Sequence, residues 1–182
     1  ADQPLPIGEG QTISQPLIVA MMTELSGAKR GSKVLEVGTG SGYQAAILDH
    51  IGARVHSIEI LPGLAESARR ALEATGHAGV QVRTGDGYQG WPEAAPFDAI
   101  LVTCAPAAIP EPLKKQLASG GKIVIPVGPV GEVQRLVVVT RGATDFTERT
   151  VDMVRFVPMV RATGSAPEAP ATPGAPASPT AP

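Results

Sequence analysis

Hydrophobic and polar positions along the chain follow two alternating patterns. Short runs of consecutive apolar residues are typical of buried strands, and apolar residues recurring every three or four positions are typical of helices. We expect strands over 33–37, 54–60, 80–83, 97–103 and 122–127, and helices over 42–51, 64–75 and 112–118. Strands that alternate with helices favour a parallel sheet with crossover helices. The predicted fold class is therefore α/β, an open, doubly wound, mostly parallel and Rossmann-like sheet.

Further elements are expected on either side of this alternating region. Pro16 opens a helix predicted over 16–25, and two strands, 134–141 and 147–157, are predicted to pair around a turn. We therefore assign residues 1–162 to one domain. From Pro167 to Pro182 proline recurs at every third position, which is the period of polyproline II. We expect 163–182 to be a disordered Pro/Ala-rich tail, with a ligand for a proline-binding domain as the alternative.

Composition excludes several classes of protein. The chain has 182 residues and a net charge of −2, so no basic surface is expected and nucleic acid is disfavoured as a partner. A lone cysteine, Cys104, excludes an internal disulfide framework and a cysteine-rich zinc site. The longest apolar runs are far below the roughly 18 residues that cross a bilayer. We expect no metal, no membrane association and a monomer.

A glycine-rich turn joins the first predicted strand of the sheet to its helix. Its sequence, Glu36-Val-Gly-Thr-Gly-Ser-Gly42, spaces three glycines by two, whereas a dinucleotide fingerprint needs glycine where Tyr43 stands. This departure disfavours a nicotinamide-dependent oxidoreductase. The spacing matches the loop that holds S-adenosylmethionine in the common methyltransferase fold. The cofactor-binding residues expected in this turn are Gly38, Thr39, Gly40 and Gly42. Glu36 either reaches the amino group of the cofactor or structures the turn.

Two carboxylates follow neighbouring strands of the predicted sheet. Glu59 ends the second strand, from where an acidic side chain can accept both ribose hydroxyls, and Asp86 follows the third, beside the expected adenine. A surface charge and a solvated loop residue are the alternatives for these two positions. Open α/β sheets bind ligands at the carboxyl ends of their strands, so we expect cofactor contacts from Glu59, Gly85, Asp86 and Gly87.

The segment Pro4-Leu-Pro-Ile-Gly-Glu-Gly-Gln-Thr-Ile-Ser-Gln-Pro16 strongly resembles the protein-L-isoaspartate (D-aspartate) O-methyltransferase family. The similarity continues through 34–43, 84–92, 97–103, 120–128 and 155–160. It implies a cytoplasmic enzyme that transfers a methyl group from S-adenosylmethionine to the free α-carboxylate of L-isoaspartyl residues in damaged proteins and peptides. By the same resemblance Ser14 is the catalytic residue, and the isoaspartyl peptide is bound by Thr12, Ile13, Ser14, Arg155 and Val157.

The implied chemistry needs few catalytic groups. A carboxylate with a pKa near 4 is already ionised at neutral pH, so no general base is required. Catalysis then depends on aligning its oxygen with the methyl group and on partial desolvation. Ser14 can donate a hydrogen bond to that carboxylate; its alternative role is to cap the helix that begins near Pro16. The three histidines are scattered, in agreement with a reaction that needs no base.

The chain departs from the family at its amino end. Family members carry a helical segment ahead of the Pro4 motif, and part of that segment covers the cofactor; here only Ala1–Gln3 precede the motif. We therefore expect the family's N-terminal segment to be absent. The alternative function is a catalytically impaired S-adenosylmethionine-binding module that lacks its lid.

Overall fold

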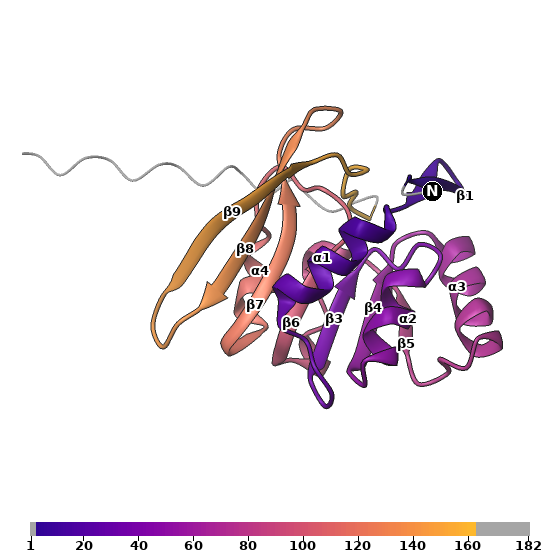
Figure 1. The fold of residues 1–182 in the computed structure, drawn as a ribbon, viewed down its shortest axis with the longest axis horizontal. Coiled ribbons are helices and arrows are strands. Elements are labelled where there is room, and N and C mark those ends of the chain that lie inside the picture. Colours follow the sequence, from indigo (N-terminus) through magenta and orange to yellow (C-terminus); the bar gives the residue numbers. More distant parts are fainter. Residues whose placement is uncertain (1–2, 163–182) are drawn as a thin grey trace, which may run out of the picture.

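The computed structural model describes residues 3–162. Within them the main sheet has seven strands in the order β5-β4-β3-β6-β7-β8-β9 (Figure 1). The parallel part consists of β3 (Lys33–Val37), β4 (Arg54–Glu59), β5 (Gln81–Thr84), β6 (Phe97–Val102) and β7 (Leu117–Val127). The antiparallel part consists of β8 (Gln134–Arg141) and β9 (Phe146–Val154). The predicted fold class is confirmed.

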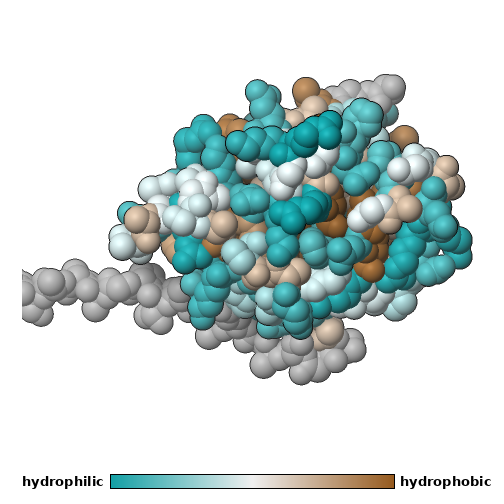
Figure 2. Space-filling view, turned by 90° about the horizontal axis from the view of Figure 1, so that it is seen from below, coloured by the Kyte–Doolittle hydropathy of each residue, from teal (hydrophilic) through white to brown (hydrophobic). Residues whose placement is uncertain are grey.

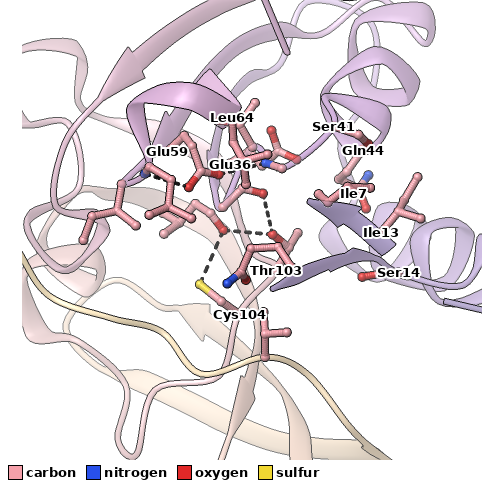
Figure 3. Close-up of a pocket in the computed structure, with 18 of the residues that line it drawn as sticks. Ile7, Ile13, Ser14, Glu36, Ser41, Gln44, Glu59, Leu64, Thr103 and Cys104 are labelled. Atoms are coloured by element: carbon pink, nitrogen blue, oxygen red, sulfur yellow. Dashed lines mark hydrogen bonds between the residues drawn. The ribbon is translucent and has the colours of Figure 1, made fainter. Parts of the chain in front are cut away.

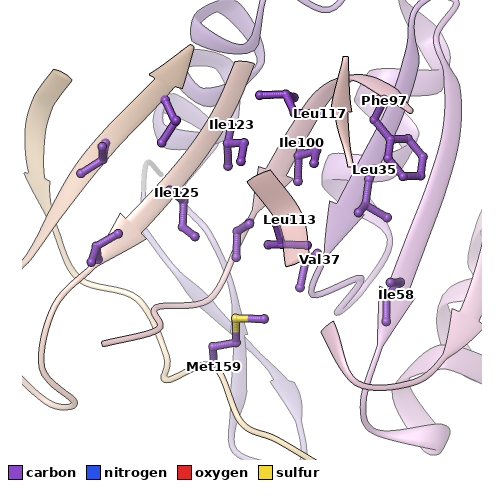
Figure 4. Close-up of a cluster of buried hydrophobic side chains, with 14 residues drawn as sticks. Leu35, Val37, Ile58, Phe97, Ile100, Leu113, Leu117, Ile123, Ile125 and Met159 are labelled. Atoms are coloured by element: carbon purple, nitrogen blue, oxygen red, sulfur yellow. The ribbon is translucent and has the colours of Figure 1, made fainter. Parts of the chain in front are cut away.

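Helices cover both faces of the sheet. On one face α1 (Pro16–Ser26), α2 (Tyr43–His50) and α3 (Pro62–Ala74) bury Met22, Leu48 and Leu72 in a cluster that includes Val34 and Leu101. On the other face α4 (Glu111–Lys115) buries Leu113 in the cluster drawn in Figure 4. Two short 3-10 turns, η1 (Gly87–Gln89) and η2 (Pro92–Ala94), follow β5. Of the helices described, none is long and apolar enough to cross a membrane.

The position of the sheet's order reversal determines where a ligand can bind. β3 pairs with β4 on one side and with β6 on the other. The loops that follow β3 and β6 therefore diverge at the carboxyl end of β3. Such a switch point is the usual ligand site of an open α/β sheet. The opposite end of the sheet, viewed in Figure 2, carries mostly hydrophilic side chains.

One predicted helix boundary is wrong. The expected helix over 112–118 ends at Lys115, and Leu117 already belongs to β7, where it pairs with Phe97. Leu113 and Leu117 are spaced as on one face of a helix, and both are fully buried. The pairing of Leu117 with a strand twenty positions earlier overrides that local pattern.

A hairpin that the pattern did not predict precedes α1. β1 (Leu5–Gly8) and β2 (Gln11–Ile13) form a separate two-stranded antiparallel sheet, with Leu5 opposite Ile13. Its turn uses positive φ at three consecutive residues, Gly8 (95°), Glu9 (50°) and Gly10 (71°). The hairpin ends directly before Ser14 and so sets the position of that residue. The tail predicted over 163–182 lies outside the described residues.

Candidate active site

A pocket lies at the switch point between β3 and β6 (Figure 3). Its walls enclose about 870 Å³ of empty space, including the open mouth. Of the sequence-predicted site residues, the pocket brings together Thr12, Ile13, Ser14, Glu36, Gly38, Thr39, Gly40, Glu59, Gly87 and Val157. These residues come from segments spread over most of the domain, and the fold gathers them at one end of the sheet.

The glycine turn is fixed by the two strands that flank β3. The amide N–H groups of Gly38 and Thr39 donate to the carbonyl of Ile58 on β4, at 2.8 and 3.3 Å. On the other side, the Thr103 hydroxyl, just beyond β6, donates to the carbonyl of Gly38 at 2.7 Å. Gly38 has a φ of 99°, and a Cβ there would lie 2.5 Å from the Thr103 oxygen. Glycine is therefore required here both by its backbone conformation and by the space available.

Glu59 holds the outer part of the same turn. One carboxylate oxygen accepts from the Gly40 amide at 2.8 Å, and the other accepts from the Leu61 amide at 3.1 Å. The side chain is only 6% exposed and lines the pocket. A carboxylate has more acceptor positions than these two bonds use, so it can still receive the hydroxyl groups of a ligand.

Glu36 is a buried acid beneath the turn. Its Oε2 accepts from the Ser57 hydroxyl at 2.5 Å, and the Ser57 oxygen is 2.6 Å from the Thr39 hydroxyl. Its Oε1 has no hydrogen-bond partner within residues 3–162. Burial raises the pKa of Glu36 to about 8; the Ser57 hydrogen bond opposes this rise and the charge of Glu59 adds to it. Glu36 thus structures the turn through Ser57, and it retains one acceptor oxygen for a cationic ligand.

The opposite wall carries Ser14, Ile13 and Ile7 (Figure 3). The N-cap of α1 is Gln15, not Ser14, and the Gln15 side chain makes no capping hydrogen bond. The alternative role of Ser14 as a helix cap is therefore wrong. Within residues 3–162 its hydroxyl makes no hydrogen bond to the protein, so it remains able to donate one into the pocket.

Four of the predicted site residues do not line the pocket, and their assignments remain predictions. Gly42 lies at the start of α2, where a Cβ would come within 3.1 Å of Leu72 on α3. Asp86 accepts from the Tyr88 amide at 2.9 Å and so caps η1, and the Gly85 amide donates to the carbonyl of Glu59. Arg155 is exposed to solvent.

Several pocket residues had no sequence signal. Thr103 and Cys104 follow β6, and the pocket includes Cys104 in its wall. Burial, with the charges of Glu59 and Glu36, raises the pKa of the Cys104 thiol to about 12, so at neutral pH it is not a thiolate nucleophile. In the described part of the chain, no three His, Cys, Asp or Glu side chains gather closely enough to hold a metal ion.

Comparisons with known proteins agree with this geometry. The family model of protein-L-isoaspartate(D-aspartate) O-methyltransferase matches residues 1–164. A protein-L-isoaspartate O-methyltransferase of Gloeobacter violaceus is 56% identical over 160 residues, which cover 88% of this chain and 78% of that protein. One of Methylorubrum populi is also 56% identical, over 91% of this chain and 78% of its own length.

A solved structure adds the same similarity in three dimensions. A protein-L-isoaspartate O-methyltransferase superposes with a TM-score of 0.80 at 31% identity, over 87% of this chain. The chain spans 52% of that solved protein, which is about half of its length.

Proposed function

Since the chain belongs to the protein-L-isoaspartate (D-aspartate) O-methyltransferase family, we propose that its pocket holds S-adenosylmethionine on the glycine turn and an isoaspartyl carboxylate beside Ser14. The chain transfers a methyl group from S-adenosylmethionine to the free α-carboxylate of L-isoaspartyl residues in damaged proteins and peptides, which starts their repair. One observation carries the assignment of the site. A single pocket joins the buried carboxylates of Glu36 and Glu59 to a serine hydroxyl that the protein leaves available.

The residues of the cofactor wall fit S-adenosylmethionine. Glu59 offers a carboxylate to vicinal hydroxyls. Glu36 offers to an ammonium group its Oε1, which has no hydrogen-bond partner within residues 3–162. Gly38 lets the turn lie against Thr103, where a Cβ would overlap the hydroxyl, and the turn so placed lines the pocket. When bound, this cofactor supplies an electrophilic methyl group on a positively charged sulfur.

The other wall orients the acceptor. The Ser14 hydroxyl donates a hydrogen bond to one carboxylate oxygen and leaves the other oxygen to attack the methyl carbon in line with the carbon–sulfur bond. Transfer of the methyl group would give a methyl ester and leave a neutral thioether, so the residues of this wall would not need to move a proton. Ile7 and Ile13 keep water away from the reacting oxygen. Rate enhancement then comes from alignment and desolvation.

The test is a transfer assay with methyl-labelled S-adenosylmethionine. Two peptides that differ only in L-isoaspartate or L-aspartate at one position are compared, with Ser14→Ala as the matched variant. We expect label on the isoaspartyl peptide alone and a large loss of label with the variant. Binding of the cofactor without any transfer would contradict the proposal and leave the cofactor-binding module as the function.

The remaining assignments are proposals as well. We propose that the protein works as a monomer in the cytoplasm and that residues 1–162 form one domain. Sedimentation of the purified chain measures its oligomeric state. Limited proteolysis tests the domain boundary, because the first cut is expected after residue 162. A stable dimer or an early cut within the sheet would contradict these two assignments.

A further inference from the structure

One wall of the pocket is formed by a short C-terminal segment, Val157–Val160, which we call the strap. Its backbone is held by Ala105: the Ala105 amide donates to the carbonyl of Val157 at 2.8 Å, and the Met159 amide donates to the carbonyl of Ala105 at 2.9 Å. The Met159 side chain is 8% exposed and belongs to the core cluster beside Val37 (Figure 4). The strap is therefore fixed on the side that faces β6.

The other side of the strap is held by Tyr88. The Tyr88 hydroxyl donates to the carbonyl of Met159 at 3.2 Å. The guanidinium of Arg161, directly after the strap, lies 3.8 Å from the centre of the Tyr88 ring. A cation stacked on an aromatic face at this distance is attractive. Tyr88 thus contacts the strap through its hydroxyl and Arg161 through its ring.

Tyr88 itself belongs to the loop on the cofactor side. Its amide is fixed by the carboxylate of Asp86, and the preceding residue, Gly87, lines the pocket. A Cβ on Gly87 would lie 2.4 Å from Val37 and 3.1 Å from the terminal methyl of Met159. The loop and the strap therefore touch at Gly87 and are hydrogen-bonded through Tyr88, with little free space between them.

We propose that Tyr88 is a positioning residue that couples the two ligands: by bonding the carbonyl of Met159, it makes cofactor binding at the 84–90 loop favour peptide binding at the strap. The inference rests on the proposed function together with two predicted contacts in the same pocket, that of Gly87 with the cofactor and that of Val157 with the peptide. When the cofactor orders the loop, the hydrogen bond from Tyr88 also restricts the conformations of the strap. The peptide then loses less conformational entropy when it binds, and its affinity rises. The coupling is reciprocal, so peptide also favours cofactor.

The experiment measures the affinity of an isoaspartyl peptide with and without saturating S-adenosylhomocysteine, for the wild-type chain and for Tyr88→Phe. Phenylalanine keeps the ring under Arg161 and removes only the hydroxyl. We expect the cofactor product to raise peptide affinity about fivefold or more in the wild-type chain and less than about twofold in the variant. The KM for peptide should rise about three- to tenfold, which is the value of one hydrogen bond, while kcat stays unchanged.

Two further variants keep the test decisive. Arg161→Gln leaves the Tyr88 hydroxyl in place and should lower the affinity ratio less than Tyr88→Phe does. Phe146→Leu removes another ring beneath an arginine, Arg141, on the outermost strand, and should leave the ratio unchanged. A ratio in Tyr88→Phe equal to that of the wild-type chain would overturn the inference. Absence of methyl transfer by the wild-type chain would instead overturn the proposed function.

Discussion

The two walls of the pocket are built in different ways. The cofactor wall stands on the ends of central strands, where the backbone and side chains of the glycine turn are bonded to β4, to Thr103 and to Glu59. The acceptor wall depends on the β1–β2 hairpin, whose strands pair only with each other within residues 3–162. On that hairpin Leu5 is 60% exposed, whereas Glu36 beneath the glycine turn is fully buried.

The difference follows from what each wall must bind. The cofactor is the same molecule in every turnover, so its wall does not need to accept ligands of different shape. A wall with fixed bonds can therefore hold the methyl group in one place. The acceptor is a residue within a polypeptide whose neighbours vary from one damaged protein to the next. An exposed hairpin can adjust to those neighbours, since few bonds must break when it moves.

The largest effect is expected from breaking the cofactor wall with Gly38→Ala. The substitution places a Cβ 2.5 Å from the Thr103 hydroxyl at a φ of 99°. Strain and overlap together cost about 3 kcal/mol, so cofactor affinity should fall about a hundredfold or more. Calorimetric titration with S-adenosylhomocysteine measures this.

The matched control is Gly120→Ala in β7. Gly120 has a similar φ of 77°, but no atom lies within 4 Å of its added Cβ. It should lose some stability and keep its cofactor affinity. Equal losses of affinity in the two variants would show that positive φ, and not contact with Thr103, determines the result.

The next largest effect is expected on the acceptor wall, from Ser14→Ala. Removing one hydrogen bond to a charged oxygen costs about 2 kcal/mol, so turnover should fall about thirtyfold. Cofactor affinity should stay the same because Ser14 is not part of the glycine turn. Steady-state kinetics with an isoaspartyl peptide, beside calorimetry, separates the two quantities. Equal losses in both would contradict the assigned role of Ser14.

A smaller effect is expected from Glu59→Gln. The amide retains one oxygen for the turn, but its NH2 group can no longer accept from the second backbone amide. Cofactor affinity should fall about tenfold, and kcat at saturating cofactor should stay close to that of the wild-type chain. A loss confined to kcat would place Glu59 in the chemical step and contradict the comparison of the two walls.

A further effect, on stability and not on the contacts of either wall with its ligand, is a pH dependence that comes from Glu36. The folded chain raises the pKa of Glu36 from 4.5 to about 8, so the stability it contributes is fully present below pH 4.5 and is lost as pH rises through 8. Glu36→Gln should flatten this part of the stability curve, as measured by denaturant unfolding at several pH values. An unchanged slope would contradict the raised pKa.

Cofactor binding should respond to the same group. A bound cation favours the ionised carboxylate, so binding near pH 7 should release a proton from Glu36 and become tighter as pH rises. Calorimetry in buffers of different ionisation enthalpy counts the protons released. Glu36→Gln should release fewer, and the same release in both proteins would assign the proton to another group.

Much of the cofactor wall could be predicted from the sequence because its signals are local. Three glycines at a spacing of two and an acid at the end of the next strand, Glu59, already describe a turn and its partner. The orientation of the Asp86 side chain could not be predicted. Its position after a strand does not reveal that it accepts a hydrogen bond from the Tyr88 amide and so caps η1. Leu117 was misassigned for a similar reason, since its partner Phe97 is distant in sequence.

The acceptor wall could be predicted only through resemblance. The three-residue strand Gln11–Ile13 is too short for a period of two to stand out, and Pro6 in its partner strand weakens the pattern further. The strand predicted over 147–157 ends too late, because β9 stops at Val154 and the strap is held instead by its hydrogen bonds to Ala105, some fifty residues earlier. Tertiary contacts, rather than local preference, place these residues at the pocket.

The place of the strap late in the chain sets the order in which the pocket is assembled. During synthesis the hairpin, the glycine turn and Ala105 leave the ribosome before Val157–Val160 do, and domains fold as the chain emerges. Because a domain folds as a unit, the pocket is complete only when this last segment has left the ribosome and docked on Ala105.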